Sequence, residues 1–557
     1  MFRKNTAHLQ GSLLSPVFML SEQKRKKLLS SEEQSFYELI FCKIKEEDFE
    51  CLYSGQESRP NAPINALVSS LILMNRKNWT YEQLFTEIDF NLLTRVALGL
   101  NTLDETPFCP ASIFNFQNKI NEYGVKTGIN LFEKVFDHLT EQELKALKLK
   151  TNIQRTDSFL AASNIRNFSR LQLLVEILIR VYRTLTEPDQ QNYREKFQEY
   201  TKSSSSQYLY HLERSDAPKK MEEIGQLYYW IARNLAPHYQ GVEIFNIFAL
   251  VYSQHFTVAA EKVTVVPPEQ LKSTMVQSPD DLEATYRQKA GKESKGQSIS
   301  VTETAHPDNA LNLITDVAIT SNTTDDSDIL NSRLDKLKEK TPELEQLHMD
   351  GAYGSPDNDD KMKELKITPI QTAVKGRKQQ VPIKINKIDA TTYTVNCPQQ
   401  AVKSILSNKR NKACFDAKVC AVCPQASACS AVLLKDERAY YFTAADYLKK
   451  RRHENINFIP DSYKNIRANV EATVCEFTNK FRKRKLKIRG FFKTTVFAYT
   501  VAVAVNFGRI YRYLLKNGQG QQPGPSLSLS LASLKAFICS FFSWFFKDLK
   551  TVNVFAT

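Results

Sequence analysis

The order of strand-like and helix-like stretches constrains the fold of this 557-residue chain more than any other feature of its sequence. Apolar residues alternate at period two, or run together over the length of one strand, and so predict five strands. These strands are residues 147–157, 297–304, 311–320, 344–350 and 367–373. Helical patterns separate the first from the second, the third from the fourth and the fourth from the fifth. This order predicts a mixed α/β core in which a helical insertion separates the first two strands.

Residues 1–140 are predicted to form a helical domain of their own. An apolar run at residues 64–74 predicts one helix. Thr80 and Gln83 are typical of the capped start of a second helix, and Pro110 opens another. Short helices joined by tight turns occur in helix-turn-helix DNA-binding units and equally in ordinary helical bundles. The pattern alone fits both.

The chain carries 75 Lys+Arg against 61 Asp+Glu, which gives a formal net charge of +14. Such an excess suits a polyanionic partner, with nucleic acid as the first choice and an anionic membrane surface as the second. The alternative interpretation is a basic soluble protein without a polyanionic partner, which can have the same excess of positive charge. The hydrophobic content of 42% supports a large core and excludes wholesale disorder.

No secretory signal opens the chain, because residues 1–20 lack an unbroken apolar core and residues 22–27 are strongly polar. We therefore expect the protein in the cytoplasm. Residues 517–530 are rich in Gly, Gln, Pro and Ser and are predicted to be a linker. The apolar stretch at residues 531–546 is interrupted by Lys535 and is short for a membrane span, so we interpret it as a packing or interfacial helix.

Three acidic residues, far apart in the chain, are candidates for one metal site. Asp157 ends the first predicted strand, and Asp350 ends the fourth. Glu471 lies beside an apolar stripe on a helix predicted over residues 463–480. Carboxylates that meet at strand ends hold the hard divalent cations that phosphodiester chemistry needs. Arg467 precedes Glu471 by one helical turn, where it is placed to pair with Glu471 or a phosphate, or to form an ordinary surface ion pair.

Other carboxylates compete with Asp350 for the second position. Asp316 lies inside a predicted strand, and Asp325, Asp326 and Asp328 crowd the start of a predicted helix. Acidic residues at a helix start accept hydrogen bonds from free backbone N–H groups. We interpret these three as helix caps and assign Asp350 as the metal ligand.

Six ordered sequence blocks accompany the acids. They are Arg59-Pro60-Asn61-Ala62-Pro63-Ile64; Thr156-Asp157-Ser158 with Asn164-Ile165-Arg166 and Ser169-Arg170-Leu171; Ser278-Pro279-Asp280-Asp281 with Ala284-Thr285-Tyr286-Arg287; Val301-Thr302-Glu303-Thr304; Asp350-Gly351-Ala352-Tyr353-Gly354; and Arg467 four residues before Glu471. Any one of these blocks alone is weak evidence for a family. Together and in this order they resemble the bacterial insertion-sequence DDE transposases, which have an RNase H-like catalytic core. The resemblance covers roughly residues 59–513.

The resemblance implies a DNA transposase. Such an enzyme recognises the terminal inverted repeats of a mobile element, cleaves there with metal-activated water, and joins the freed 3′-hydroxyl to target DNA. It implies that Asp157, Asp350 and Glu471 hold Mg²⁺ or Mn²⁺, that double-stranded DNA is the partner, and that a homodimer forms on the DNA. The family usually has a Lys seven residues after the Glu, but here Thr478 occupies that position and Lys480 follows two residues later. The resemblance therefore does not identify which side chain binds the DNA end.

A cluster of cysteines predicts a structural zinc site. Cys420, Cys423 and Cys429 are closely spaced, and the fourth ligand is Cys397, with Cys414 as the alternative. Thiolates are suitable ligands for Zn²⁺, and the metal would stabilise the fold of an insertion that has too little apolar content for a core of its own. Reduced, unliganded thiols are the other interpretation.

A basic run at residues 480–493 follows the Glu471 helix directly. A solvated charge run is the usual interpretation of such a stretch, but its position favours contact with DNA phosphates. The candidate DNA-binding residues are Arg287, Arg467, Lys480, Arg482, Lys483, Arg484 and Lys485.

The predicted architecture is an α/β, RNase H-like mixed-sheet core with a helical N-terminal domain, a helical insertion and a Cys-containing insertion. The predicted domains are a DNA-end-binding domain at 1–140, the first part of the core at 147–375 with the helical insertion at about 165–290, the Cys-containing insertion at 376–460, the rest of the core at 461–516, and a linker with an apolar tail at 517–557. The alternatives are a non-catalytic, transposase-derived protein that binds the same DNA ends, and a zinc-stabilised nucleic-acid scaffold whose acidic residues are structural.

Overall fold

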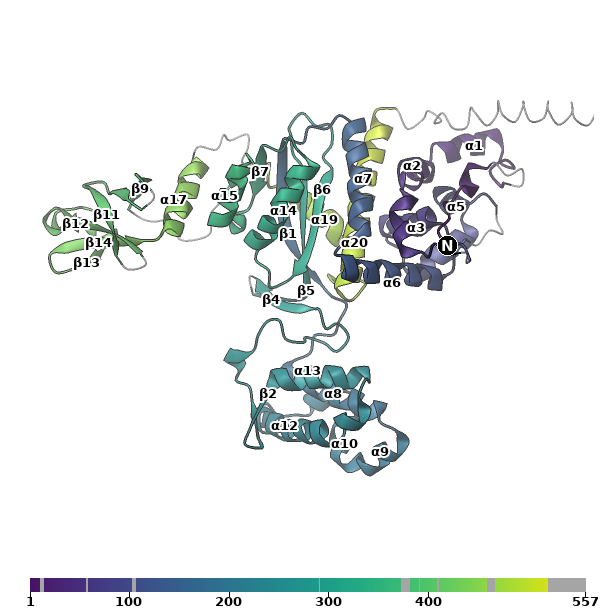
Figure 1. Ribbon diagram of the computed structural model, residues 1–557, viewed down its shortest axis with the longest axis horizontal. Coiled ribbons are helices and arrows are strands. Elements are labelled where there is room, and N and C mark those ends of the chain that lie inside the picture. Colours follow the sequence, from purple (N-terminus) through teal and green to yellow (C-terminus); the bar gives the residue numbers. More distant parts are fainter. Residues whose placement is uncertain are drawn as a thin grey trace, which may run out of the picture. The chain divides into compact units, whose positions relative to one another are not determined.

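The computed structural model describes residues 1–10, 15–56, 59–102, 107–289, 291–371, 381–389, 391–407, 410–457 and 466–518 (Figure 1). The chain divides into two compact units. Unit 1 comprises Met1–Leu149, Asp308–Ile314 and Tyr499–Thr557, and unit 2 comprises Lys150–Pro307 and Thr315–Ala498. The apolar helix predicted at residues 531–546, and the predicted linker beyond residue 518, lie outside the described residues.

The N-terminal part of unit 1 is helical, as predicted. Its α-helices are α1 (Glu22–Leu29), α2 (Glu32–Leu39), α3 (Ile64–Lys77), α4 (Tyr81–Phe90), α5 (Leu92–Ala97), α6 (Pro110–Thr127) and α7 (Leu131–Ala146). The predicted capped start of α4 is confirmed, because the Thr80 hydroxyl accepts from the Gln83 backbone N–H and the Gln83 side chain accepts from that of Thr80. Both reciprocal bonds satisfy backbone donors that a helix start leaves free.

The long helix α20 (Phe491–Lys516) contributes its residues from Tyr499 onward to unit 1. There Asn506 forms two hydrogen bonds with the backbone of Ile314, at 2.8 and 2.9 Å, and Phe507 packs edge-on against Phe36. Of the helices in the described ranges, α20 is long and apolar enough to cross a membrane by length and composition. However, 78% of its most apolar window is buried inside the protein, as in a core helix.

Unit 2 contains a mixed β-sheet. Its strands are β1 (Ile153–Ala162), β4 (Thr285–Lys289), β5 (Lys292–Thr304), β6 (Ile314–Ser321), β7 (Gln346–Met349) and β8 (Thr368–Gln371). They lie in the order β4-β5-β1-β7-β8, and β6 also pairs with β5 (Figure 1). β1 is antiparallel to β5 and parallel to β7, which is parallel to β8. β1 is therefore an interior strand with neighbours of opposite direction on its two sides.

Two helices connect the later strands, α14 (Asp326–Lys340) and α15 (Pro356–Glu364). Parallel neighbours such as β7 and β8 need a crossover connection of this kind. Leucines of α14 pack in one cluster with Leu347 and Met349 of β7. The apolar faces of these elements therefore bury one another at the strand that leads to Asp350.

All five predicted strands are present, with helices between them as predicted. The first boundary was wrong: β1 begins at Ile153 and continues to Ala162. Leu147 and Leu149 belong to the end of α7, where their N–H groups bond to the carbonyls of residues 143 and 144, and Lys148 takes the left-handed conformation (φ 50°). A helix end of this type also spaces apolar residues by two and so imitates a strand.

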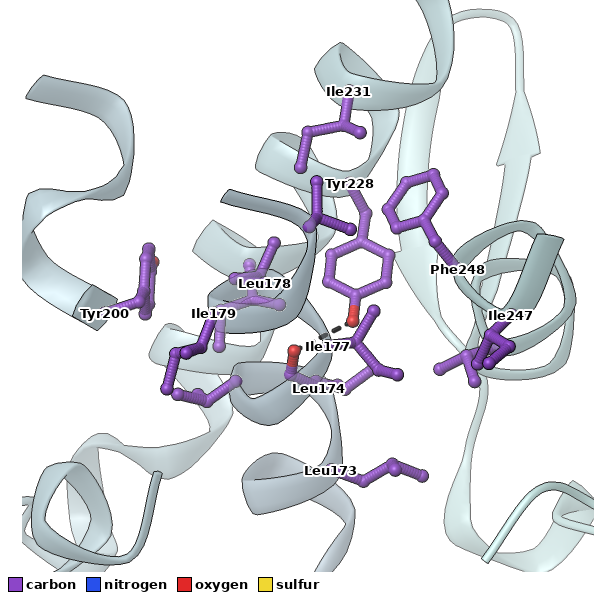
Figure 2. Packing of buried hydrophobic residues seen from close by; sticks show 14 of the residues in the cluster. Leu173, Leu174, Ile177, Leu178, Ile179, Tyr200, Tyr228, Ile231, Ile247 and Phe248 are labelled. Atoms are coloured by element: carbon purple, nitrogen blue, oxygen red, sulfur yellow. Dashed lines mark hydrogen bonds between the residues drawn. The ribbon is translucent and has the colours of Figure 1, made fainter. Parts of the chain in front are cut away.

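The block between β1 and β4 is the helical insertion. Its elements are α8 (Arg170–Thr184), α9 (Glu187–Asn192), α10 (Arg194–Thr201), α11 (Ser205–Tyr210), α12 (Ala217–Asn234), α13 (Glu243–His255) and the hairpin β2 (Phe256–Ala259) and β3 (Lys262–Val265). The buried Tyr228 ring stacks on Phe248, and its hydroxyl donates to the Leu174 carbonyl at 2.9 Å (Figure 2). Because the insertion has its own apolar cluster, it packs independently of the sheet.

The Cys-containing insertion is an antiparallel β-structure. Its strands are β9 (Lys384–Lys387), β10 (Tyr393–Asn396), β11 (Ala401–Ser407), β12 (Arg410–Asp416), β13 (Val432–Leu433) and β14 (Glu437–Phe442), with the short helix α16 (Ala417–Ala421) and α17 (Ala444–Asn457). The sheet order is β13-β14-β12-β11-β10-β9. Val395, Phe415 and Phe442 are buried in a cluster of this insertion. The prediction that it lacks a core of its own was wrong, because its apolar residues are spread one or two to a strand and combine only when the strands pair.

We predict that His255 makes the helical insertion less stable in acid. Arg170 Nε donates to His255 Nδ1 at 3.1 Å, and burial, with the Arg170 charge as a smaller cause, lowers the pKa of His255 from 6.5 to about 4. Below pH 6.5 the unfolded chain therefore binds a proton that the folded chain does not. The stabilising contribution is complete above pH 6.5 and is lost as the pH falls towards 4.

The test compares urea unfolding of the wild type and His255→Gln at pH 7 and pH 5. The wild type should lose about 2 kcal/mol more unfolding free energy than the variant between these pH values. Equal losses in the two proteins would show that His255 does not couple protonation to folding.

Candidate functional site

Strand pairing brings Asp157 and Asp350 to the same level on adjacent strands. β1 and β7 run parallel, and Arg155 is paired with His348. Each Asp follows its paired residue by two positions, and side chains two residues apart on a strand point to the same face. Because neighbouring strands lie about 4.8 Å apart, the two carboxylates are neighbours on one face of the sheet.

The prediction that Asp157 ends its strand was wrong, whereas Asp350 directly follows β7 as predicted. Asp157 is in the middle of β1 and remains paired with Val301 of β5. The described pairing with β7 stops at Arg155 and His348. A break in the ladder leaves β1 without a bonded neighbour on the β7 side at the level of the two acids. Such a break is where a sheet has room for a ligand.

Arg467 joins the two carboxylates. Its Nη2 donates to Asp157 Oδ2 at 2.9 Å and lies 3.9 Å from Asp350 Oδ2. Each carboxylate also accepts from a backbone N–H, Asp157 from Ser158 at 2.9 Å and Asp350 from Gly351 at 2.6 Å. From the sequence, Glu471 or a phosphate was the predicted partner of Arg467, and the structure pairs Arg467 with Asp157 instead.

Burial raises the pKa of Asp157, and the nearby Asp350 charge raises it further. The Arg467 charge and the Ser158 N–H lower it, but burial is the largest cause. A carboxylate in this environment gains from a cation close by. The site therefore attracts positive charge, and Arg467 supplies it in this structure.

Glu471 occupies the first turn of α19 (Val470–Thr478) and is exposed. Its side chain forms no hydrogen bond or ion pair within the described ranges, and no group of three or more His, Cys, Asp or Glu side chains there is spaced to hold a metal ion. α19 lies against β1 (Figure 1), and Phe477 packs on Phe159 with ring centres 5.7 Å apart. The structure thus brings two of the three predicted acids together and places the third on a helix packed against the same strand.

Three of the four competing acids, Asp316, Asp325 and Asp326, have protein partners. Asp316 is buried and paired with Arg333 and with Lys340. The capping interpretation was wrong, because Asp325 holds the N-cap position of α14 without a side-chain cap, and Asp326 accepts from the Ser158 hydroxyl at 2.6 Å. Side chains from other strands outcompete the free N–H groups of the helix for these carboxylates.

The basic run contains a tight turn. Arg482 and Lys485 exchange two backbone hydrogen bonds, and Lys483 and Arg484 between them both have positive φ, 50° and 65°. This geometry exposes three charges, those of Arg482, Lys483 and Arg484. The Leu486 N–H bonds to the Ala162 carbonyl at 2.8 Å, so the turn lies at the end of the strand that bears Asp157.

Two other predicted DNA-binding residues have protein partners. Lys485 Nζ donates to the Ile165 carbonyl at 2.6 Å. Arg287 donates to the carbonyls of Asn322 and Thr324, both at 2.9 Å. These contacts tie the turn and strand β4 to their neighbours, so the three exposed charges of the turn are better placed for a phosphate.

Four cysteines line one small enclosed cavity of about 20 Å³, which has room for a single water-sized occupant. They are Cys397, Cys420, Cys423 and Cys429. Cys414 is not among the lining residues. Gln400 donates its backbone N–H to Cys397 Sγ at 3.2 Å and its side-chain N–H to Cys420 Sγ at 3.5 Å. Of the two predicted sets of four, the one with Cys397 lines a single cavity, although within the described residues the thiols are not spaced as metal ligands.

One buried ion pair beside these acids was not predicted from the sequence. Glu303 of β5 faces Arg155 across the β1–β5 pairing, with 2.6 Å between Oε1 and Nη2. The signal was present, because Glu303 is the charged residue in the run 298–304, whose other residues are apolar or carry hydroxyls.

Neighbouring carboxylates on β1 and directly after β7, together with an exposed basic turn at the end of β1, are features of metal-dependent enzymes that act on nucleic acid. Residues 395–511 match a family model described as Transposase DDE domain, which supports a DDE transposase with DNA as its partner. The match includes Glu471, the basic turn and most of the Cys-containing insertion, but neither Asp157 nor Asp350. No curated protein and no solved structure matches the chain.

Proposed function

We propose that this protein is a bacterial insertion-sequence transposase that cleaves the terminal inverted repeats of its element and joins the 3′ ends to target DNA. The observation that carries the proposal is the placement of Asp157 on β1 and Asp350 directly after the parallel neighbour β7, with Arg467 within 4 Å of both carboxylates. The family match also supports the proposal, because the matched residues include the helix of Glu471 and the basic turn. The partner is double-stranded DNA, and the protein acts as a homodimer because two element ends must be joined.

We assign the sheet of unit 2 to an RNase H-like core. Support comes from the order and directions of its strands. β1 lies in the interior, with the antiparallel β5 on one side and the parallel strands β7 and β8 on the other. The helical and Cys-containing insertions interrupt this core between β1 and β4, and between β8 and α19.

Asp157 and Asp350 would hold the catalytic Mg²⁺ or Mn²⁺, and Glu471 would complete the set of ligands. Carboxylate oxygens are the donors that these ions prefer, and the raised pKa of Asp157 fits a site that needs a cation. The bound metal would activate water or a 3′-hydroxyl and stabilise the leaving oxygen. Arg467 neutralises Asp157 in this structure, and beside a bound metal its guanidinium is placed to bind a DNA phosphate.

We also propose that Cys397, Cys420, Cys423 and Cys429 bind a structural Zn²⁺. The donor chemistry fits, because thiolates suit zinc and the lined cavity has room for one ion. The two hydrogen bonds from Gln400 to sulfur are of the kind that support thiolate charge. Burial raises the pKa of Cys420, and the nearby Cys397 and Cys429 thiols raise it further, so the three thiols are neighbours that zinc would draw to bonding distance.

Replacing Asp350 should abolish cleavage without abolishing DNA binding. A labelled duplex carrying the terminal repeat is incubated in Mg²⁺ with the wild type, with Asp350→Ala or with Asp360→Asn. Asp360 is an exposed acid on α15, so its variant is the control. We expect nicking at the repeat boundary by wild type and by the Asp360 variant, and a loss on the order of 10³ in rate for Asp350→Ala. Binding without cleavage by wild type, in Mg²⁺ or Mn²⁺, would indicate a non-catalytic DNA-binding protein instead.

Neutralising the basic turn should weaken DNA binding and its salt dependence. The triple variant Arg482→Gln, Lys483→Asn and Arg484→Gly keeps the turn, since Asn and Gly suit positive φ. If all three charges contact phosphates, the slope of log K against log salt should fall by up to about 2.7.

The matched control neutralises three exposed charges of the helical insertion, Lys202, Arg214 and Lys219, by substitution with Gln. It should leave the slope unchanged. The same slope in the turn variant and the wild type would mean that the turn is only a solvated charge run.

The zinc proposal predicts one equivalent of zinc in the purified protein. Cys420→Ser should remove it and lower the melting temperature, whereas Cys414→Ser should retain it, because Cys414 lies outside the cavity. Elemental analysis and thermal unfolding measure both effects. A zinc-free wild-type protein, or equal zinc loss in the two variants, would contradict the assignment.

A further inference from the structure

A buried ion pair connects the strand of Asp157 to its neighbour. Arg155 and Glu303 face one another across β1 and β5, and their side chains are 8% and 0% exposed. Arg155 precedes Asp157 by two residues and so shares its face of the strand. Charges this deep need partners, because removing one of them leaves the other buried and uncompensated.

The same two side chains bind the segment that carries the other site residues. Thr473 Oγ1 on α19 donates to Glu303 Oε2 at 2.7 Å, and Arg155 Nη1 donates to the Ile466 carbonyl at 3.0 Å. Ile466 directly precedes Arg467, and Thr473 follows Glu471 by two residues. The ion pair is therefore attached to this segment on both sides of Arg467 and Glu471.

We infer that Glu303, held by Arg155, is a positioning residue that fixes the Arg467–Glu471 segment against the strand of Asp157. This inference rests on the proposed function for its effect on catalysis. Glu303 reaches none of the three acids by a described contact, so it acts through Thr473 and Arg155. Its effect is on where Glu471 stands relative to Asp157 and Asp350, which determines whether three carboxylates can share one metal site.

A purely stabilising ion pair is the alternative, and the same sheet contains a matched example. Asp316 of β6 is 4% exposed and pairs with Arg333 and Lys340 of α14. Neither of those partners belongs to α19. Replacing Asp316 therefore removes a buried charge of similar depth while the anchor of α19 stays intact.

The experiment uses the full chain with Glu303→Gln, Thr473→Val and the control Asp316→Asn. Thr473→Val is nearly isosteric and removes only the hydroxyl, which keeps a folded variant available if Glu303→Gln is unstable. Hydrogen exchange of the α19 amides reports the anchoring directly, without cleavage. Cleavage of terminal-repeat DNA then separates kcat from KM, with the Mg²⁺ concentration at half-maximal rate as a third readout.

We expect about tenfold faster exchange in α19 for both test variants and not for Asp316→Asn. We also expect kcat to fall by about 10-fold to 100-fold, with KM for DNA within twofold, and half-maximal activity at higher Mg²⁺. Unchanged exchange in α19, or faster exchange with unchanged kcat, would overturn the inference. A wild type that does not cleave, while α19 loosens only in the test variants, would refute the proposed function and leave the anchoring supported.

Discussion

The parallel pairing of β1 with β7 is the constraint on which the site depends. It places Asp157 and Asp350 level with one another, although almost two hundred residues of chain separate them. The pairing is specific because β1 is an interior strand, bonded to β5 on its other side. A shift of one residue would turn every side chain of β1 to the opposite face and separate the two acids.

Charge compensation organises the residues around that pairing. The two acids share Arg467, Glu303 is neutralised by Arg155, and Asp316 by Arg333 and Lys340. The last two pairs are buried and hold elements together. The first is more exposed, and it is the one in which a charge can be exchanged for another cation. This difference in burial distinguishes the carboxylates that we propose as metal ligands from those that maintain the fold.

The elements that were predicted correctly have local signals, whereas the short strands β2 to β4 and the strands of the Cys-containing insertion, β9 to β14, were not predicted. The five strands and the capped start of α4 follow from spacing and from residues within one turn of each other. The errors arose where distant residues compete. Leu147 and Leu149 looked like a strand but close a helix, and Asp326 looked like a cap but accepts from Ser158 of β1. The core of the Cys-containing insertion was missed because it exists only after its strands pair.

The sequence by itself determined the residue types of the site, the order of strands and helices, and the run of basic residues after Glu471. Only the tertiary structure decided which residues meet. It paired Arg467 with Asp157 rather than Glu471, exposed Arg482, Lys483 and Arg484 while turning Lys485 inward, and chose Cys397 over Cys414 for the cysteine cavity. The physical reason is that periodicity and capping act over a few residues, whereas ion pairs and strand register depend on parts of the chain that only folding brings together.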